Sequence, residues 1–190
     1  VLAGVHAALE AGLEVKANIV ALGGVTDHEA GALVDWAWDL GITPRFIELM
    51  PLGEAAKLPS ARFSSAEQIL ERLGDRVEAD APRAGDVGKG PARYLPAADG
   101  SGRRVGFITA ISDEFCESCN RVRLTAKGDL RACLADRKAV SLLDLLRAGA
   151  SDAELSWAIH WALRTKDAGH HFHAADVSEH EHVGMSLIGG

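Results

Sequence analysis

Three cysteines are the residues of this 190-residue chain best suited to chemistry, and two of them form a Cys-x-x-Cys pair. Cys116 and Cys119 are spaced so that both thiolates can face one ion or cluster, and a return of the chain can bring Cys133 beside them. A closed zinc site normally takes four ligands, whereas three thiolates on a four-iron cluster leave one iron open for a substrate atom. The spacing therefore predicts a metal or iron–sulfur site on these three residues.

The cysteine spacing alone leaves other interpretations open. One of the eight histidines could complete a zinc site, or the pair could carry no metal at all. A Cys-x-x-Cys pair in a reducing compartment more often indicates metal or redox chemistry than a structural disulfide. The residues around the cysteines must decide between a cluster and zinc.

Four basic side chains are candidates for binding an anion. Arg121 and Arg123 lie two apart on an expected strand, so that both would point to one face beside the cysteines. The planar guanidinium binds phosphate oxygens in a bidentate manner. Lys16 and Arg45 lie on two other predicted strands. The alternative for the arginine pair is a solvated hairpin face, and for Lys16 and Arg45 a charge that reaches solvent from a strand end.

Helix and strand patterns alternate in the first part of the chain. Apolar spacing predicts helices over residues 2–11 and 26–40, and short apolar runs predict strands over residues 13–22 and 42–50. Thr26 and Glu29 have the spacing of a capping box for the second helix. This βα alternation is typical of a parallel sheet or barrel, whose active sites lie at the carboxyl ends of the strands.

The middle of the chain is less regular. Residues 51–62 are rich in Pro, Gly and Ser, which makes a domain boundary plausible there. Ser64 and Glu67 predict the capping box of a helix that ends at residue 73. Residues 75–102 are predicted to form a loop with an edge strand at residues 93–95.

The last third of the chain is predicted to hold a hairpin followed by two helices. A strand is expected over residues 103–111, and a hairpin over 121–134 that turns at Lys127-Gly128 and is bracketed by the cysteines. Helices are expected over residues 142–147 and 152–164, the second opened by a capping box of Ser151 and Glu154.

Composition limits the classes of partner. The chain is 47% hydrophobic, which is enough for about one core. Its net charge of −7 argues against general binding to nucleic acid or to a membrane surface, so that any phosphate site must be local. No apolar run is long enough to span a membrane, and no signal peptide is recognisable, so we expect a cytoplasmic protein.

The residues around the cysteines resemble a known signature. The segment Phe115-Cys-Glu-Ser-Cys-Asn-Arg-Val-Arg-Leu-Thr-Ala-Lys-Gly-Asp-Leu-Arg-Ala-Cys-Leu134 is similar to the auxiliary-cluster signature of GTP 3′,8-cyclases, also called molybdenum cofactor biosynthesis protein A. The resemblance extends through 15–18, 44–51, 106–109 and 185–190, and it covers nearly the whole chain.

The resemblance implies a fold and a domain division. It implies an α/β protein in which residues 1–62 are the last βα units of a partial (β/α)6 TIM-type radical S-adenosylmethionine barrel. Residues 63–190 would then form an α+β domain that carries an auxiliary [4Fe-4S] cluster and binds GTP. It also implies a homodimer.

The resemblance assigns roles to individual residues. Cys116, Cys119 and Cys133 would hold the auxiliary cluster. Lys16, Arg45, Arg121 and Arg123 match positions that bind GTP, and Met50 matches a contact to S-adenosylmethionine, although core packing is the better interpretation of Met50 from sequence alone. Gly189 and Gly190 resemble a family tail that reaches the active site, whereas a frayed terminus is the usual alternative. Asn18, on the same face as Lys16, is expected to line the same cavity.

The implied reaction is the radical conversion of GTP to (8S)-3′,8-cyclo-7,8-dihydroguanosine 5′-triphosphate, which passes to cyclic pyranopterin monophosphate synthase. A 5′-deoxyadenosyl radical would take hydrogen from the ribose C3′. The Cys-x-x-x-Cys-x-x-Cys motif that binds the second, S-adenosylmethionine-cleaving [4Fe-4S] cluster is absent here, and the chain starts at Val1, so we expect an inactive C-terminal fragment. The alternatives are a zinc-stabilised binding module and a non-catalytic homologue.

Other patterns in the sequence carry little weight. Residues 85–90 fail the P-loop pattern at two positions. The histidines of residues 170–182 form a tract that occurs often by composition alone. Trp157 and Trp161 are one helical turn apart, which indicates packing rather than base stacking.

Overall fold

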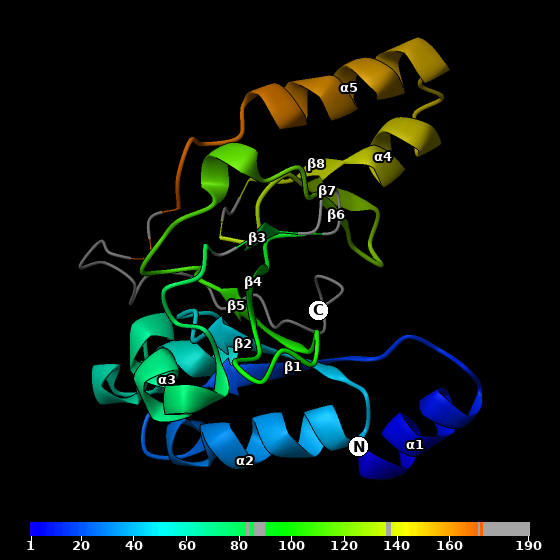
Figure 1. The fold of residues 1–190 in the computed structure, drawn as a ribbon. Coiled ribbons are helices and arrows are strands. Elements are labelled where there is room, and N and C mark those ends of the chain that lie inside the picture. The colour runs from blue at the N-terminus through cyan, green and yellow to red at the C-terminus, as the bar shows by residue number, and fades with distance from the viewer. Residues whose placement is uncertain (83, 86–89, 136–137, 171, 173–190) are drawn as a thin grey trace. The chain divides into compact units, whose positions relative to one another are not determined.

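The computed structural model describes residues 1–82, 84–85, 90–135, 138–170 and 172. The chain divides into two compact units (Figure 1). Unit 1 consists of residues 1–49 and 59–115, and unit 2 consists of residues 50–58 and 116–190. Each unit is described separately.

A mixed sheet forms the centre of unit 1. Its strand order is β1-β2-β5-β4-β3. The first three strands, β1 (Lys16–Ala21), β2 (Thr43–Glu48) and β5 (Arg104–Ile108), are parallel to one another. β4 (Arg93–Pro96) and β3 (Ala84–Gly85) extend the sheet in antiparallel pairing. The α/β class is confirmed, but β4 lies between two strands, so its prediction as an edge strand is wrong.

Helices cover one face of this sheet. α2 (Thr26–Asp39) and α3 (Ala66–Leu73) bury apolar side chains against it, whereas α1 (Leu2–Glu10) buries none of its residues. Two short 3-10 turns, η2 (Ser60–Arg62) and η3 (Gly74–Arg76), flank α3. The burial of β2 alternates residue by residue, which is the pattern of a strand with one face in a core.

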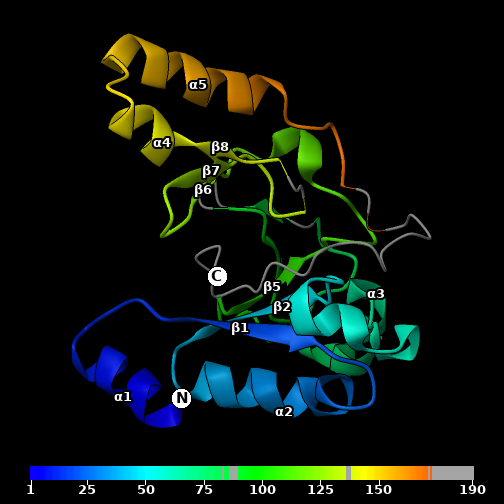
Figure 2. The same ribbon diagram turned by 180° about the vertical axis from the view of Figure 1, so that it is seen from behind.

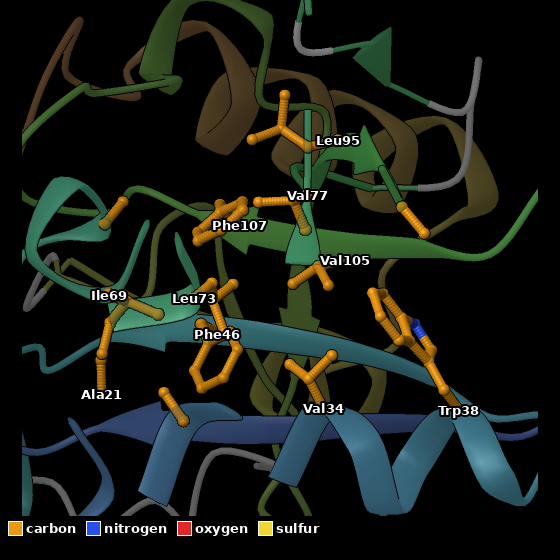
Figure 3. Close-up of a cluster of buried hydrophobic side chains, with 13 residues drawn as sticks. Ala21, Val34, Trp38, Phe46, Ile69, Leu73, Val77, Leu95, Val105 and Phe107 are labelled. Carbon is orange, nitrogen blue, oxygen red and sulfur yellow. The ribbon is translucent and has the colours of Figure 1, made fainter. Parts of the chain in front are cut away.

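The core lies between α2, α3 and the sheet. Its side chains interdigitate in Figure 3, where Phe46 of β2 and Phe107 of β5 stack at a ring separation of 6.2 Å. Val34 and Trp38 of α2 face the strands, and Ile69 of α3 closes the same cluster. This packing fixes which side of each strand points away from the helices.

Two of the expected capping boxes differ in the structure. Thr26 is the first residue of α2 and not its cap, and its hydroxyl donates to Val20 O at 2.7 Å. The cap of α3 is Ser65, which forms a capping box with Gln68, whereas Ser64 is buried. Ser64-Glu67 and Ser65-Gln68 have the same spacing, so the sequence pattern alone did not distinguish them.

Unit 2 contains a small antiparallel sheet and two helices. The sheet order is β6 (Arg123–Leu124), β7 (Asp129–Arg131) and β8 (Val140–Ser141), which confirms the hairpin, with shorter strands than expected. α4 (Leu142–Arg147) and α5 (Asp152–Arg164) follow, and the capping box of Ser151 and Glu154 is confirmed. The two helices lie side by side in both views (Figures 1 and 2). Two 3-10 turns, η1 (Gly53–Lys57) and η4 (Cys116–Ser118), complete the unit.

The two compact units group the residues differently from the division into 1–62 and 63–190. The reason is that β5 pairs with β2 and carries residues 104–108 into the sheet of unit 1. The division inferred from the resemblance remains a prediction about the longer protein. No helix in the described residues is long and apolar enough to span a membrane.

Candidate functional site

Cys116 is the first residue of the single turn η4 of unit 2, and Cys119 directly follows its last residue. The Cys119 amide donates to Cys116 O at 3.1 Å, which closes a turn of the i to i+3 type. Side chains three apart on a 3-10 turn lie on the same side of it. Both cysteines are half-buried, and neither forms a disulfide. The local fold therefore suits a pair of ligands to one group.

Cys133 follows β7, the second strand of the hairpin. Gly128 makes the tight turn with φ of 79°, and a Cβ there would lie 2.5 Å from Leu143 Cβ, so only glycine fits. Cys133 is also a half-buried free thiol. The predicted hairpin is confirmed, and its delivery of Cys133 to the cysteine pair stays a prediction.

The described residues contain no group of three or more His, Cys, Asp or Glu side chains that could hold a metal ion as they stand. The chemistry of the donors nevertheless fits a thiolate-bound group, because Cys116, Cys119 and Cys133 are outside any disulfide and partly accessible. The assignment of the three ligands remains a prediction.

The Cys119 thiol has a lowered pKa. Burial acts to raise its pKa, but hydrogen bonds from the Arg121 backbone amide and guanidinium, the charge of Arg121 and a hydrogen bond from Lys166 together lower the pKa to about 7. A lowered pKa increases the fraction of thiolate, which is the form that binds metals. The electrostatics favour a ligand role for Cys119.

Arg121 and Arg123 do not share one strand. Arg123 lies in β6, but Arg121 precedes that strand and is engaged with Cys119. The argument that strand alternation points both side chains to one face therefore fails for Arg121. Arg123 instead has Arg131 of β7 as its direct cross-strand partner, and sequence reasoning missed this second cation. The turn at Lys127-Gly128 could have revealed it, since the turn sets the hairpin register.

Lys16 and Arg45 lie on adjacent strands of unit 1, as predicted. Arg45 is opposite Asn18 in the β1–β2 register, and its Nε donates to Asn18 Oδ1 at 2.9 Å. Lys16 is the first residue of β1, and its Nζ lies 3.2 Å from Glu14 Oε1. Lys16 is therefore at the amino end of its strand and not at the carboxyl end where barrel sites are expected.

A glycine makes room for the Arg45 side chain. Arg45 is opposite Gly106 of β5, and a Cβ at Gly106 would lie 2.8 Å from Arg45 Cγ and 2.9 Å from the Tyr94 ring. Arg104 stacks over the same ring at 4.2 Å. The sheet face that points away from α2 and α3 is thus lined by guanidinium groups and one aromatic ring.

Glu48, at the carboxyl end of β2, is a functional candidate that the sequence did not reveal. It is 2% exposed, and its carboxylate accepts from the amides of Ala66, Ile111 and Ser112 at 3.0, 2.9 and 2.8 Å and from the Ser112 hydroxyl. Ser112 is four residues before Cys116. Glu48 therefore fixes the segment from which the chain enters η4.

Met50 is half-buried and follows β2 by two residues. Its carbonyl accepts from the Leu52 amide at 2.8 Å, and the predicted contact to S-adenosylmethionine is not tested. Gly189 and Gly190 lie outside the described residues.

A cavity of about 260 Å³ in unit 1 contains none of the candidate residues. It lies where β2 and β5 begin, beside Trp38, Thr43 and Arg104. Arg103 in its wall stacks on Trp38 and pairs with Asp99. We assign it no function.

Comparison with known proteins identifies the family of this chain. The profile of the Molybdenum Cofactor Synthesis C family matches residues 42–172, well over half of the chain, and the chain belongs to this family. Its role is therefore in molybdenum cofactor biosynthesis.

Individual relatives agree with this membership. The chain is 43% identical over 173 residues to a GTP 3′,8-cyclase of Paracoccus denitrificans, covering 90% of this chain and 49% of that protein. It is 42% identical over 191 residues to a GTP 3′,8-cyclase of Caulobacter vibrioides, covering 100% of this chain and 54% of that protein. The chain spans about half the length of these relatives. The family resemblance inferred from the cysteine segment is confirmed.

Proposed function

We propose that this chain is the substrate-binding, auxiliary-cluster part of a GTP 3′,8-cyclase. The observation that carries the proposal is the Cys116-x-x-Cys119 turn, in which Arg121 hydrogen-bonds to the Cys119 thiol and neither cysteine forms a disulfide. This turn combines a ligand pair with a cation suited to a nucleotide. The relatives named GTP 3′,8-cyclase supply the reaction.

Cys116, Cys119 and Cys133 would hold an auxiliary [4Fe-4S] cluster. Such a group supplies an iron with no protein ligand, at which a substrate atom can bind. Arg121 neutralises charge at the Cys119 sulfur, and Glu48 holds the segment that leads into the turn. These residues prepare the ligand pair before any group is bound.

Four basic residues would bind GTP, as the family resemblance implies: Lys16, Arg45, Arg121 and Arg123. Guanidinium groups suit this task because each can bind two phosphate oxygens at once. Met50 would contact S-adenosylmethionine, and Gly189 and Gly190 would approach the reacting nucleotide.

The reaction of the longer protein would convert GTP to (8S)-3′,8-cyclo-7,8-dihydroguanosine 5′-triphosphate with S-adenosylmethionine. β1 and β2 would be part of a (β/α)6 TIM-type barrel, whose other strands and second [4Fe-4S] cluster would lie in the rest of the longer protein. The product would pass to cyclic pyranopterin monophosphate synthase. We further propose a cytoplasmic homodimer, and no activity for this chain alone.

Anaerobic reconstitution with iron and sulfide, followed by electron paramagnetic resonance of the reduced protein, tests the proposal. We expect a four-iron signal that changes when GTP is added. Cys133→Ser should lower iron and sulfide to background, with Ser156→Ala of α5 as the control that retains both. Bound zinc without a GTP response would instead support a zinc-stabilised binding module, and a cluster without a GTP response would support a non-catalytic homologue.

A further inference from the structure

Lys166 connects the end of α5 to the cysteine turn. Its Nζ donates to the Cys119 carbonyl oxygen at 2.8 Å, across 47 residues of sequence. Lys166 is half-buried, so this contact is partly protected from water. Nothing in the spacing of the cysteines indicates that a residue so distant would reach them.

The position of Lys166 is well determined by its helix. α5 opens with a complete capping box at Ser151 and ends at Thr165, whose hydroxyl donates to Trp161 O at 2.9 Å. The same helix packs on α4, β7 and β8. A side chain that leaves the end of such a helix has a fixed origin, and its contact can restrain a loop.

Asp167, the residue after Lys166, contacts the segment that follows Cys133. Asp167 pairs with Lys138, five residues after Cys133, at 2.9 Å. Both partners of this pair are more than 40% exposed, so it contributes little to stability by itself. The two consecutive residues Lys166 and Asp167 nevertheless contact the chain on either side of the hairpin that separates Cys119 from Cys133.

We propose that Lys166 is a positioning residue for the auxiliary cluster, which holds the Cys119 loop through its carbonyl and places a fixed positive charge beside the cluster. This inference rests on the proposed function. A lysine at the end of a helix also interacts favourably with the helix dipole, and that interaction alone would affect only the stability of α5.

The charge of Lys166 has a predictable effect on a bound cluster. Net charge and hydrogen bonds near the sulfurs set the reduction potential of an iron–sulfur cluster. A cation stabilises the reduced, more negative state, so its removal should lower the potential. A residue that acted only on helix stability would leave the potential unchanged.

The test compares Lys166→Met, which keeps the aliphatic stem, with Lys166→Arg, which keeps the charge. Lys127→Met in the hairpin turn is the control, because it removes the same charge from an exposed position of unit 2. The first measurement is hydrogen exchange of residues 116–121 in the metal-free chain. We expect at least several-fold faster exchange in Lys166→Met, and rates near those of the parent chain in Lys166→Arg and Lys127→Met.

The second measurement is the reduction potential of the reconstituted cluster. We expect a lower potential and faster loss of iron to a chelator in Lys166→Met, with recovery of both in Lys166→Arg. Exchange rates and potential that match those of Lys127→Met would overturn the inference. If even the parent chain binds no cluster, the proposed function fails, whereas unchanged exchange in Lys166→Met refutes loop positioning independently of any cluster.

Discussion

Asn18 of β1 lies directly opposite Arg45 of β2, and its amide oxygen accepts a hydrogen bond of 2.9 Å from Arg45 Nε. The contact uses one edge of the guanidinium and leaves the two terminal nitrogens for other partners. Because a strand side chain has a fixed origin, this bond selects the direction in which the Arg45 fork points. The pair is therefore a means of presenting a cation from the sheet.

Two substitutions at Asn18 separate orientation from charge. Asn18→Ala should weaken GTP binding by roughly three- to tenfold, since a net hydrogen bond contributes about 0.5–1.5 kcal/mol. Asn18→Asp keeps the hydrogen bond to Arg45, but the new carboxylate neutralises the charge of Arg45 and repels phosphate. We therefore expect a larger loss of GTP affinity. Isothermal titration calorimetry with GTP measures both. If Asn18→Asp and the parent chain bind GTP with equal affinity, the assignment of Arg45 to the phosphate site is wrong.

Gly106→Ala should displace the Arg45 side chain. The added Cβ would lie 2.8 Å from Arg45 Cγ and 2.9 Å from the Tyr94 ring, which is itself buried. We expect weaker GTP binding and a loss of about 1–3 kcal/mol in the free energy of unfolding, as for other overpacked sites. Gly4→Ala is the control, because a Cβ there meets nothing within 4 Å. Urea denaturation that shows equal stability of the two variants would refute this prediction.

Glu48→Gln should destabilise unit 1. In the variant, an NH₂ group replaces one carboxylate oxygen and faces backbone N–H groups, so that two hydrogen-bond donors oppose each other. We expect a loss of roughly 2–3 kcal/mol in the free energy of unfolding. Glu71→Gln on the exposed side of α3 is the matched control and should change stability by less than about 0.5 kcal/mol. Chemical denaturation of the metal-free chain provides the comparison, and similar values for both variants would contradict the role assigned to Glu48.

The pH dependence of Cys119 alkylation follows from its thiol pKa of about 7. The thiolate is the reactive form, so the rate should be low below pH 6, half-maximal near pH 7 and constant above pH 8, within about one unit. Arg121→Met removes a stabilising cation and should move the midpoint upward. Iodoacetamide labelling of the metal-free chain with peptide mass analysis gives the profile. A midpoint near that of an isolated thiol, about 8.5, would show that Arg121 and Lys166 do not act on Cys119.

Local patterns predicted local structure well in this chain. Ser151 and Glu154 form their expected capping box because both partners are within one turn of helix and no tertiary contact competes. Thr26 has the same sequence pattern, but its hydroxyl is taken by the end of β1, where it bonds to Val20 O and accepts from the Leu22 amide. The end of β1 competes for the Thr26 hydroxyl because it lies close in space, and the capping-box pattern does not include it.

Long-range pairing limits what the sequence predicts. The parallel pairing of β2 with β5 joins residues about sixty positions apart, and no periodicity identifies that partner. The three cysteines were recognisable as candidate ligands from their spacing and neighbours. Glu48 and Lys166 could not be recognised from the sequence, because their proposed roles depend on backbone groups that they contact in distant segments.

The division of the chain into two units also limits how they can be exchanged between proteins. The polypeptide passes from one unit to the other after Leu49, after Leu58 and after Phe115. No single cut separates the units, since residues 50–58 interrupt the first and belong to the second. Gene fusion or recombination at one point would split a unit, so we expect the cysteine-bearing unit to be inherited together with the sheet of unit 1.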